Sequence, residues 1–181
     1  MNSLAVPVLI AYTRRVHLID LPDLERAELS PAATSDTAEI LVLQRCCWMQ
    51  EALLNDTLDI PALHETLEDV RDWVRTWSVW TVRLESRLIA AVRARTVGDT
   101  WEIGRLMVAP DLAGRGLGRW LLTYAEEQAP VWATTFELFT GKRSTRNITM
   151  YERAGYRITE DAAVPAGHIQ VAVQLVKTRR S

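Results

Sequence analysis

The chain has 181 residues, of which 48% are hydrophobic and 24% are charged, and its formal net charge is −2 at pH 7. These values are typical of a globular domain that is large enough to bury a substantial core. The charge argues against a protein that binds nucleic acid through a basic surface. No apolar run is long enough to span a membrane, and the three histidines lack metal-ligand spacing, so we expect neither a membrane partner nor a metal site.

The two cysteines, Cys46 and Cys47, are neighbours within an apolar helical pattern. They cannot join distant segments, which indicates a reducing environment rather than a secreted disulfide scaffold. The apolar stretch "LAVPVLIA" has no positive charge before it and is followed by Arg14 and Arg15, the opposite order to a secretion signal. We therefore expect a cytoplasmic protein.

Two helices are predicted in the first half of the chain. Asp36 and Glu39 have the spacing of a capping box, which predicts a helix that begins there and ends near Leu54 with that leucine on its apolar face. Pro61 suits the start of a second helix, and apolar residues recur at helical spacing from there to Trp77.

After Trp77 the hydrophobic period changes to that of strands. The segments "VWTVRLE", "LIAAVRART" and "WEIGRLMV" predict an antiparallel three-strand meander. An amphipathic helix from Leu117, the strand "TFELFT", a helix ended by Gly155, and two final strands then follow. This order predicts an α/β fold with a mixed, mostly antiparallel sheet and helices on both faces. Residues 1–25 are expected to be an extension or an extra strand ("VLIAY"), and residues 26–181 a single domain.

The glycine loop "AGRGLGR", which covers residues 113–119, lies between a strand and a helix. Its backbone amides and the helix N-terminus suit an anion such as phosphate. A Walker A loop would need Gly-Lys-Ser/Thr where Gly118 is followed by Arg119. A dinucleotide fingerprint would need glycine at Arg119, and the βαβ repeat around it is missing.

The segment from Trp101 to Tyr156 resembles the GCN5-related N-acetyltransferase (GNAT) family. That family has a Q/R-x-x-G-x-G/A loop between a strand and a helix, and the loop here matches it except that Ala113 stands where Gln or Arg is usual. A later signature of the family corresponds to "NITMYERAGY", from Asn147 onward. The resemblance covers about residues 26–177 and implies a GNAT-like fold with acetyl-CoA as cosubstrate.

The resemblance also implies which residues contact acetyl-CoA. Met107 and Val108 would supply backbone contacts to the pantetheine arm and the acetyl carbonyl. Asn147 and Ser144 share the expected hydrogen bond to pantetheine. The loop would hold the pyrophosphate, with its two arginines adding charge, through Ala113, Gly114, Arg115, Gly116, Leu117, Gly118 and Arg119.

Two residues are predicted to be catalytic. Tyr151 matches the family tyrosine that protonates the CoA thiolate, and a phenol is neutral at pH 7 and can donate a proton. Glu102 matches the glutamate base of histone-modifying members, with Glu51 and Glu137 as alternatives. Strand alternation predicts that Glu102 lies on the same side as Gly104, Leu106 and Val108.

The predicted function is direct transfer of an acetyl group from acetyl-CoA to a primary amine, either of a small molecule or of a protein. Direct transfer is favoured because neither cysteine is expected near the cleft. Acidic residues between Glu51 and Asp72 form a candidate attracting surface for a cationic amine. The alternative is a non-catalytic module that binds acyl-CoA as a sensor. The protein is expected to be a monomer or a homodimer.

Overall fold

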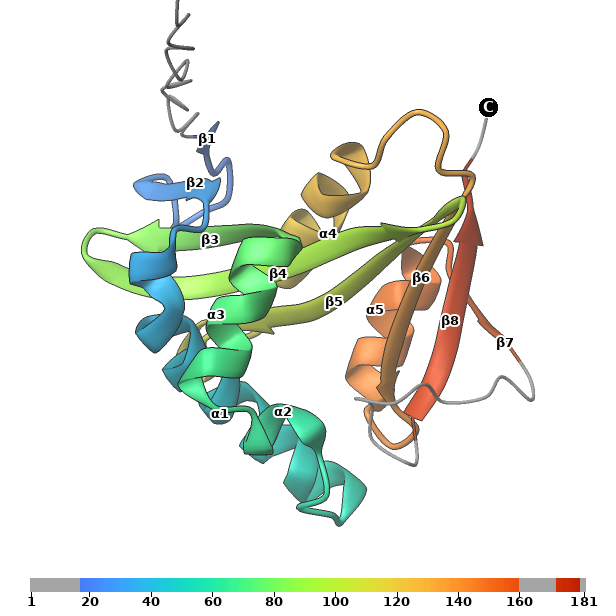
Figure 1. Cartoon of the computed structure of the whole chain (residues 1–181), viewed down its shortest axis with the longest axis horizontal. Helices are drawn as coiled ribbons and strands as arrows, with labels where there is room; N and C mark the ends of the chain where they lie inside the picture. The colour runs from blue at the N-terminus through green and yellow to red at the C-terminus, as the bar shows by residue number, and fades with distance from the viewer. Residues whose placement is uncertain (1–16, 160–171, 180–181) are drawn as a thin grey trace, which may run out of the picture.

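The strands of the sheet lie side by side in the order β1-β2-β3-β4-β5-β6-β8-β7 (Figure 1). The computed structural model describes residues 17–159 and 172–179. Among these residues every strand pairing is antiparallel except that of β5 with β6. The predicted mixed, mostly antiparallel sheet is therefore confirmed.

The first two strands extend the sheet beyond the predicted meander. β1 (His17–Leu18) pairs with β2 (Ala27–Pro31), which pairs with β3 (Ser78–Leu84). Ile19 and Leu24, in the connection between β1 and β2, are buried in the main core. The predicted strand "VLIAY" lies outside the described residues, and the domain division at residue 25 stays a prediction.

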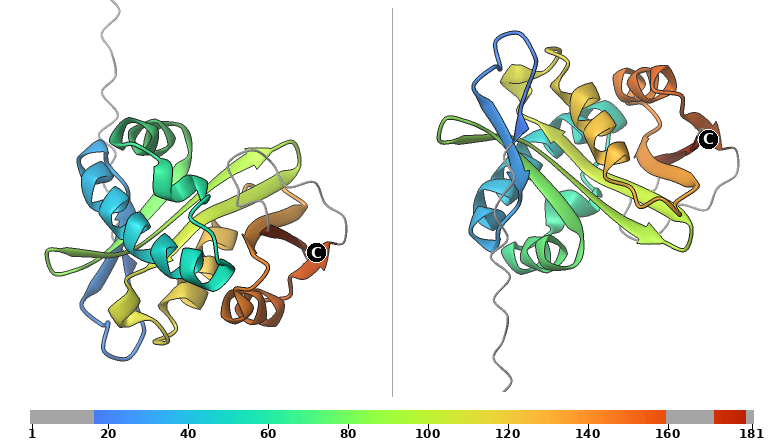
Figure 2. Two further views of the ribbon diagram at one scale, coloured as in Figure 1. Left: turned by 90° about the horizontal axis from the view of Figure 1, so that it is seen from below. Right: turned by 90° about the horizontal axis from the view of Figure 1, so that it is seen from above.

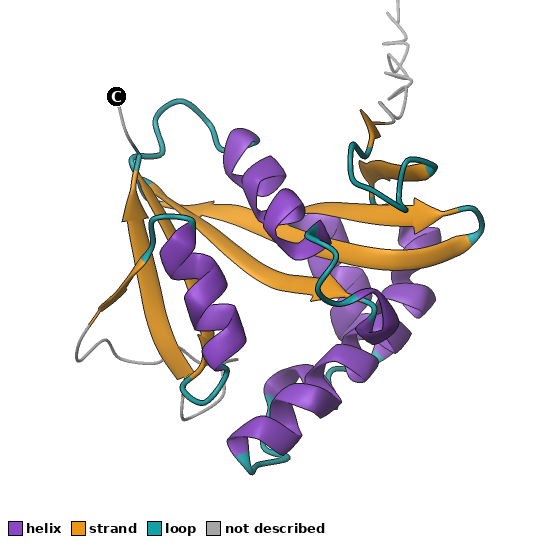
Figure 3. Cartoon of the chain, turned by 180° about the vertical axis from the view of Figure 1, so that it is seen from behind, coloured by secondary structure: helices purple, strands orange, loops and turns teal. Residues whose placement is uncertain are grey.

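Helices cover both faces of the sheet, and Figure 2 shows the two layers on either side of the strands. One face carries α1 (Thr37–Asn55), α2 (Pro61–His64) and α3 (Leu67–Thr76). The other face carries α4 (Leu117–Glu127) and α5 (Thr145–Arg153), which lie in front of the strands in Figure 3. The buried side of α4 includes Leu117, Leu121 and Ala125, as its amphipathic pattern predicts.

The second predicted helix is divided into α2 and α3. The helix is interrupted at Thr66 because this residue is the N-cap of α3. Its hydroxyl accepts a hydrogen bond from the Asp69 amide at 3.2 Å, and the Asp69 carboxylate accepts one from the Thr66 amide at 2.7 Å. Glu65 lies between the two helices in an extended conformation. The break turns the Glu65 side chain toward the sheet, where it contacts Arg105.

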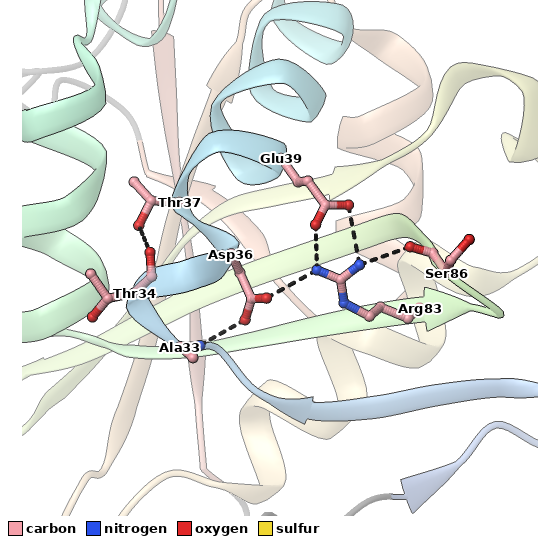
Figure 4. Close-up of polar contacts among 7 residues, drawn as sticks. All are labelled: Ala33, Thr34, Asp36, Thr37, Glu39, Arg83 and Ser86. Atoms are coloured by element: carbon pink, nitrogen blue, oxygen red, sulfur yellow. Dashed lines mark hydrogen bonds and ion pairs between the residues drawn. The ribbon is translucent and has the colours of Figure 1, made fainter.

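The predicted capping box at the start of α1 is wrong, because Asp36 and Glu39 bind an arginine instead (Figure 4). Nη2 of Arg83, on β3, donates to Asp36 at 2.9 Å and to Glu39 at 2.6 Å. The second carboxylate oxygen of Asp36 accepts from the Ala33 amide at 2.7 Å. The hydrogen bond from Arg83 lowers the pKa of the Glu39 carboxyl. Leu54 also departs from expectation, since it is exposed rather than packed.

β5 (Thr100–Val108) and β6 (Thr135–Gly141) part soon after they meet. Their parallel pairing covers only residues 100–102 of β5 and 135–137 of β6. β5 stays paired with β4 (Arg87–Val97) to its end, while β6 pairs along its length with β8 (Ala172–Thr178), which in turn pairs with β7 (Arg157–Thr159). The backbone edges of β5 and β6 beyond these three pairs therefore face a gap.

A β-bulge at Arg105 changes which side chains of β5 share a face. Gly104 pairs with Arg93 and Met107 with Ala91, so one residue of β4 stands opposite two of β5, and Arg105 has φ +49°. Leu106 and Val108 contact the Gly118 region of α4. The predicted alternation is wrong because the bulge moves these two residues to the face opposite Glu102.

Glu102 and Gly104 lie on the α3 face. The Glu102 carboxylate accepts from Arg95, whose guanidinium lies over the Trp77 ring at the end of α3. The Gly104 backbone lies against Arg93, which also packs on α3 tryptophans. Sequence alternation alone does not reveal the bulge, so it could not have predicted that the side chains of β5 change face after Arg105.

Replacing Asp36 by alanine is expected to destabilise the protein by about 1–3 kcal/mol, because it leaves the Ala33 amide and part of the Arg83 guanidinium without an acceptor in a buried place. Glu39→Ala removes a half-exposed partner of the same arginine and is expected to cost under about 1 kcal/mol. Urea unfolding measures both free energies. Equal losses in the two variants would contradict the buried role of Asp36.

Candidate active site

A cleft opens where β5 and β6 part, and it holds about 720 Å³ of space including its open mouth. Residues from both faces of the sheet meet in it, because the gap between the strands leaves no backbone to separate them. Its lining comes from α1, α2, β5, β6, α5 and the first residue of β8, and includes Trp48, Glu51, Ile60, Gly104, Arg105, Leu106, Thr140, Asn147, Tyr151 and Ala172.

Glu51 joins α1 to α5 across the cleft. Its carboxylate accepts a hydrogen bond from Asn147 Nδ2 at 2.9 Å and another from the Ser144 hydroxyl. Asn147 and Ser144 are the two residues that share the predicted pantetheine contact. Asn147 lines the cleft, whereas Ser144 is buried beneath it with its hydroxyl held by Glu51. Glu51 thus orients the residue that faces the expected donor arm.

Asn55 reinforces this junction and was not foreseen from the sequence. Its Nδ2 donates to the Glu51 carbonyl at 2.9 Å and to Ser144 Oγ at 3.1 Å, while its Oδ1 accepts from the Arg143 amide at 3.1 Å. Gly141 makes room for it, since a Cβ at that position would overlap the Asn55 side-chain amide. No local pattern marks this junction, because Ser144 and Arg143 lie about ninety residues from Asn55.

Tyr151 lies on α5 one turn after Asn147, and both line the cleft. The Tyr151 side chain is buried, and its ring packs against that of Tyr156 with 6.1 Å between centroids. Burial raises the pKa of the Tyr151 phenol, and the negative charge of Glu51 raises it further. The phenol is therefore protonated at neutral pH and available as a donor within the cleft.

The three candidate carboxylates occupy different places. Glu51 lines the cleft. Glu102 is not among the described lining residues, and its carboxylate is held by Arg95 at 2.8 Å. Glu137 stands opposite Glu102 at the last paired position of β6 and also lies outside the described lining. The role of Glu102 as base stays a prediction, while the geometry brings Glu51 and Tyr151 together.

A buried ion pair forms one wall of the cleft. Arg105 donates to Glu65 at 2.5 Å, and its guanidinium lies 5.3 Å from the centre of the Trp48 ring. Burial acts to raise the pKa of the Glu65 carboxyl, but the Arg105 charge and hydrogen bonds from Arg105 and Gln44 outweigh it and lower that pKa. Glu65 is thus an ionised partner of Arg105, and the sequence pattern marked neither residue for this pairing.

The glycine loop leads into α4 with two residues in the left-handed region. Gly114 has φ +92°, and Gly116, the N-cap of α4, has φ +86°, so both positions favour glycine. At Gly118 the nearest side-chain atoms to an added Cβ lie at 3.6 Å, which is room for alanine. Ala113 is exposed and extended.

Three arginines surround the loop. Arg115 and Arg119 are exposed, as expected for residues that face a ligand in solvent. Arg115 lies 3.7 Å from Asp23, a weak and exposed ion pair. Arg146, on α5, was not predicted: its Nη2 would lie 3.2 Å from a Cβ at Gly114. These cations and the amino end of α4 suit a polyanion.

Met107 and Val108 lie at the end of β5, and Met107 is buried. The Val108 carbonyl accepts a hydrogen bond from the Cys47 thiol of α1, with 3.3 Å between sulfur and oxygen. Cys47 therefore contacts the end of the strand that is expected to hold the donor arm, although neither cysteine is among the described residues that line the cleft. Burial raises the pKa of the Cys47 thiol to about 12, so it carries a proton at neutral pH.

Neither a metal centre nor a membrane helix is found in the described ranges. Within residues 17–159 and 172–179 no three His, Cys, Asp or Glu side chains gather in a way that suits a metal ion. No described helix has the length and apolar character needed to cross a bilayer.

The fold resembles those of solved acetyltransferases. An acetyltransferase from Streptococcus agalactiae superimposes with a TM-score of 0.67 at 18% identity, covering 86% of this chain and 99% of that one. An acetyltransferase from Thermus thermophilus gives 0.64 at 17%, with 84% and 97% covered. The PaiA N-acetyltransferase from Thermoplasma acidophilum, in complex with coenzyme A, gives 0.61 at 14%, with 84% and 99% covered.

A search of curated proteins finds no match to the sequence. The family model of the Acetyltransferase (GNAT) family matches residues 43–156, which is more than half of the chain and contains the glycine loop, the cleft strands and Tyr151. The chain therefore belongs to the GNAT family and is an N-acetyltransferase.

Proposed function

We propose that the protein transfers the acetyl group of acetyl-CoA directly to a primary amine bound in the cleft between β5 and β6. The observation that carries this proposal is the meeting of Glu51, Asn147 and Tyr151 beside the unpaired edge of β5. A proton acceptor, an amide and a proton donor then lie next to the strand edge where a thioester arm can pair. We further propose a cytoplasmic enzyme that is a monomer or a homodimer.

Acetyl-CoA binds along the edge of β5 and across the start of α4. The loop amides from Ala113 to Gly118 hold the pyrophosphate, and Arg115, Arg119 and Arg146 add charge-assisted hydrogen bonds. The pantetheine arm pairs with the backbone at Met107 and Val108, where the gap leaves the strand edge open. Asn147, oriented by Glu51, hydrogen-bonds the arm from the α5 side.

The reaction has one bond-making and one bond-breaking event at the thioester carbonyl. The amine nitrogen attacks the carbonyl carbon, the carbon–sulfur bond breaks, and the amine proton passes to a carboxylate. Glu51 is the carboxylate that lines the cleft, so it is the base that the geometry favours, with Glu102 retained from the sequence prediction. A lysine-like amine needs such a base because its deprotonation at pH 7 costs about 4–5 kcal/mol.

Tyr151 donates the proton that the leaving thiolate takes up. Burial raises the pKa of its phenol, which makes it a weaker acid than a phenol in water. Burial raises the pKa of a thiol as well, as Cys47 demonstrates with a pKa of about 12. A thiolate formed in the same cleft therefore competes for the Tyr151 proton more strongly than a thiolate in solvent. Cys47 itself is a poor nucleophile at neutral pH, which supports direct transfer without an acetylated cysteine.

The position of the cleft between α1, α2 and α5 supports a small amine as the acceptor, rather than a folded protein surface. The acidic residues between Glu51 and Asp72 give less support for a cationic acceptor than their number alone suggests, because several of their carboxylates are already bound. Glu65 is bound to Arg105, Glu68 to Arg71, and Asp69 to the N-terminus of α3. The charges of these three residues are thus bound within the protein, and Glu51 is the acidic residue among the described residues that line the cleft.

The decisive experiment is a screen for CoA release from acetyl-CoA with a panel of small primary amines and N-terminal peptides. Turnover with at least one amine, accompanied by an acetylated product in the mass spectrum, is expected. Tight acetyl-CoA binding by calorimetry without turnover of any amine would instead favour the sensor that binds acyl-CoA without catalysis.

Replacing Tyr151 by phenylalanine is expected to lower kcat about 100-fold, the scale of a lost general acid, while the KM for acetyl-CoA changes little. Tyr156→Phe is the matched control, since that neighbouring tyrosine is buried against Tyr151 but is not among the described residues that line the cleft. Steady-state kinetics measures both. An unchanged kcat in Tyr151→Phe would remove the general acid from the mechanism.

The two candidate bases are distinguished by their pH profiles. Glu51→Gln keeps the shape of the side chain but cannot take a proton, so kcat/KM is expected to fall about 100-fold and to lose its acidic limb. Glu102→Gln is expected to keep that limb. The reverse pattern, with the acidic limb lost only in Glu102→Gln, would assign the base to Glu102.

A further inference from the structure

Arg93 is a partly buried cation whose charge is not matched by a bonded carboxylate in the described structure. It lies on β4, and its guanidinium carbon stands 4.0 Å from the centre of the Trp77 ring and 4.9 Å from that of Trp73. Its Nε is buried and has no hydrogen-bond partner among the described residues. A buried donor without an acceptor is costly, so this group is one that a ligand can satisfy.

Arg93, Arg95 and Arg105 together carry one more positive charge than Glu65 and Glu102 can match. Arg95 is bound to Glu102 and Arg105 to Glu65. Arg93 faces the carboxylates of both pairs at longer range, together with the Arg105 and Arg95 cations. Burial lowers the pKa of Arg93 to about 9, and the Arg105 charge acts in the same direction. The guanidinium is nevertheless mostly charged at pH 7.

Gly104 connects Arg93 to the cleft. Gly104 lines the cleft, and Arg93 Nε lies 3.6 Å from the place where a side chain at that position would begin. Arg105, which lines the same part of the wall, also has a buried Nε without a partner among the described residues. Two donors that lack acceptors thus border the strand position where no side chain fills the space.

The cleft therefore has two chemically different regions. Glu51 and Tyr151 provide the region where an amine loses its proton and the thiolate gains one. The region at Gly104 is lined by the Arg105 cation, and the Arg93 side chain packs directly against Gly104. An acceptor that satisfies both has an amine at one end and an anion at the other.

We propose that the acceptor is a primary amine that also carries a carboxylate, and that Arg93, with Arg105, is the specificity-determining group that binds this carboxylate beside Gly104. This inference rests on the proposed acetyl transfer to an amine in the same cleft. A carboxylate fits because guanidinium donors and carboxylate oxygens form charge-assisted hydrogen bonds of matching geometry. Binding it supplies the missing acceptor.

The test compares each amine that carries a carboxylate with the corresponding uncharged carboxamide. The wild-type enzyme is assayed with a series of ω-amino acids of increasing length and with the carboxamide of each. The best pair is expected to show a kcat/KM at least about 10-fold higher for the carboxylate, the scale of a hydrogen bond to a charged group. Arg93→Gln is expected to lower this carboxylate-to-carboxamide ratio about 10- to 100-fold, and Arg93→Lys to restore part of it.

Arg95→Gln is the matched control. Arg95 lies two residues along the same strand and packs on the same Trp77 ring, but its charge is already bound to Glu102. Its substitution is expected to leave the carboxylate-to-carboxamide ratio unchanged. Thermal unfolding of each variant checks that the arginine–tryptophan packing survives. If Arg93→Gln does not fold, the wild-type ratio decides alone.

The outcomes separate this inference from the function on which it rests. Carboxamides used as well as their carboxylates, or equal losses for both in Arg93→Gln, would overturn the assignment of Arg93 while leaving the acetyltransferase activity in place. No turnover of any amine in the panel or in the wider screen would overturn the proposed function itself.

Discussion

The parting of β5 and β6 after three residue pairs is the constraint on which the site depends. If the strands continued side by side, their backbones would separate the helices on one face of the sheet from those on the other. The gap instead allows α1 to reach α5, and Glu51 holds Asn147 and Ser144 through it. The same gap exposes the edge of β5, so one geometric feature provides both the opening and the polar groups within it.

The bulge at Arg105 determines what each face of β5 presents to this opening. Without the extra residue, Leu106 would lie on the α3 face and Arg105 on the α4 face. With it, Gly104 and Arg105 both face the helices of the first layer, and Leu106 contacts α4. Arg105 has a left-handed backbone at the bulge, and its guanidinium binds Glu65, which lies at the break between α2 and α3. The Arg105–Glu65 ion pair at the wall of the cleft therefore depends on both the bulge in β5 and the break between α2 and α3.

The sequence was informative where the evidence is local. The meander, the glycine loop and the helix ending at Gly155 follow from periodicity and turn chemistry within short windows, and the structure contains all three. The predictions were wrong where a single residue or a distant contact determines the position of a side chain. A single bulged residue places Leu106 and Val108 on the opposite face of β5 from the predicted one. Asp36 binds Arg83 instead of capping α1. Asn55, Arg93 and Cys47 owe their positions to partners far along the chain, which no spacing rule reveals.

The junction between α1 and α5 also has a thermodynamic consequence. β1–β5 and β6–β8 share only a short parallel pairing, so the hydrogen bonds that Glu51 accepts and that Asn55 makes form part of the polar seam between the two halves of the sheet. A cosubstrate that tightened this seam would change the affinity of the second ligand, and the second would change the first by the same factor. The strength of this coupling between the two substrates is then a property of the seam rather than of either pocket.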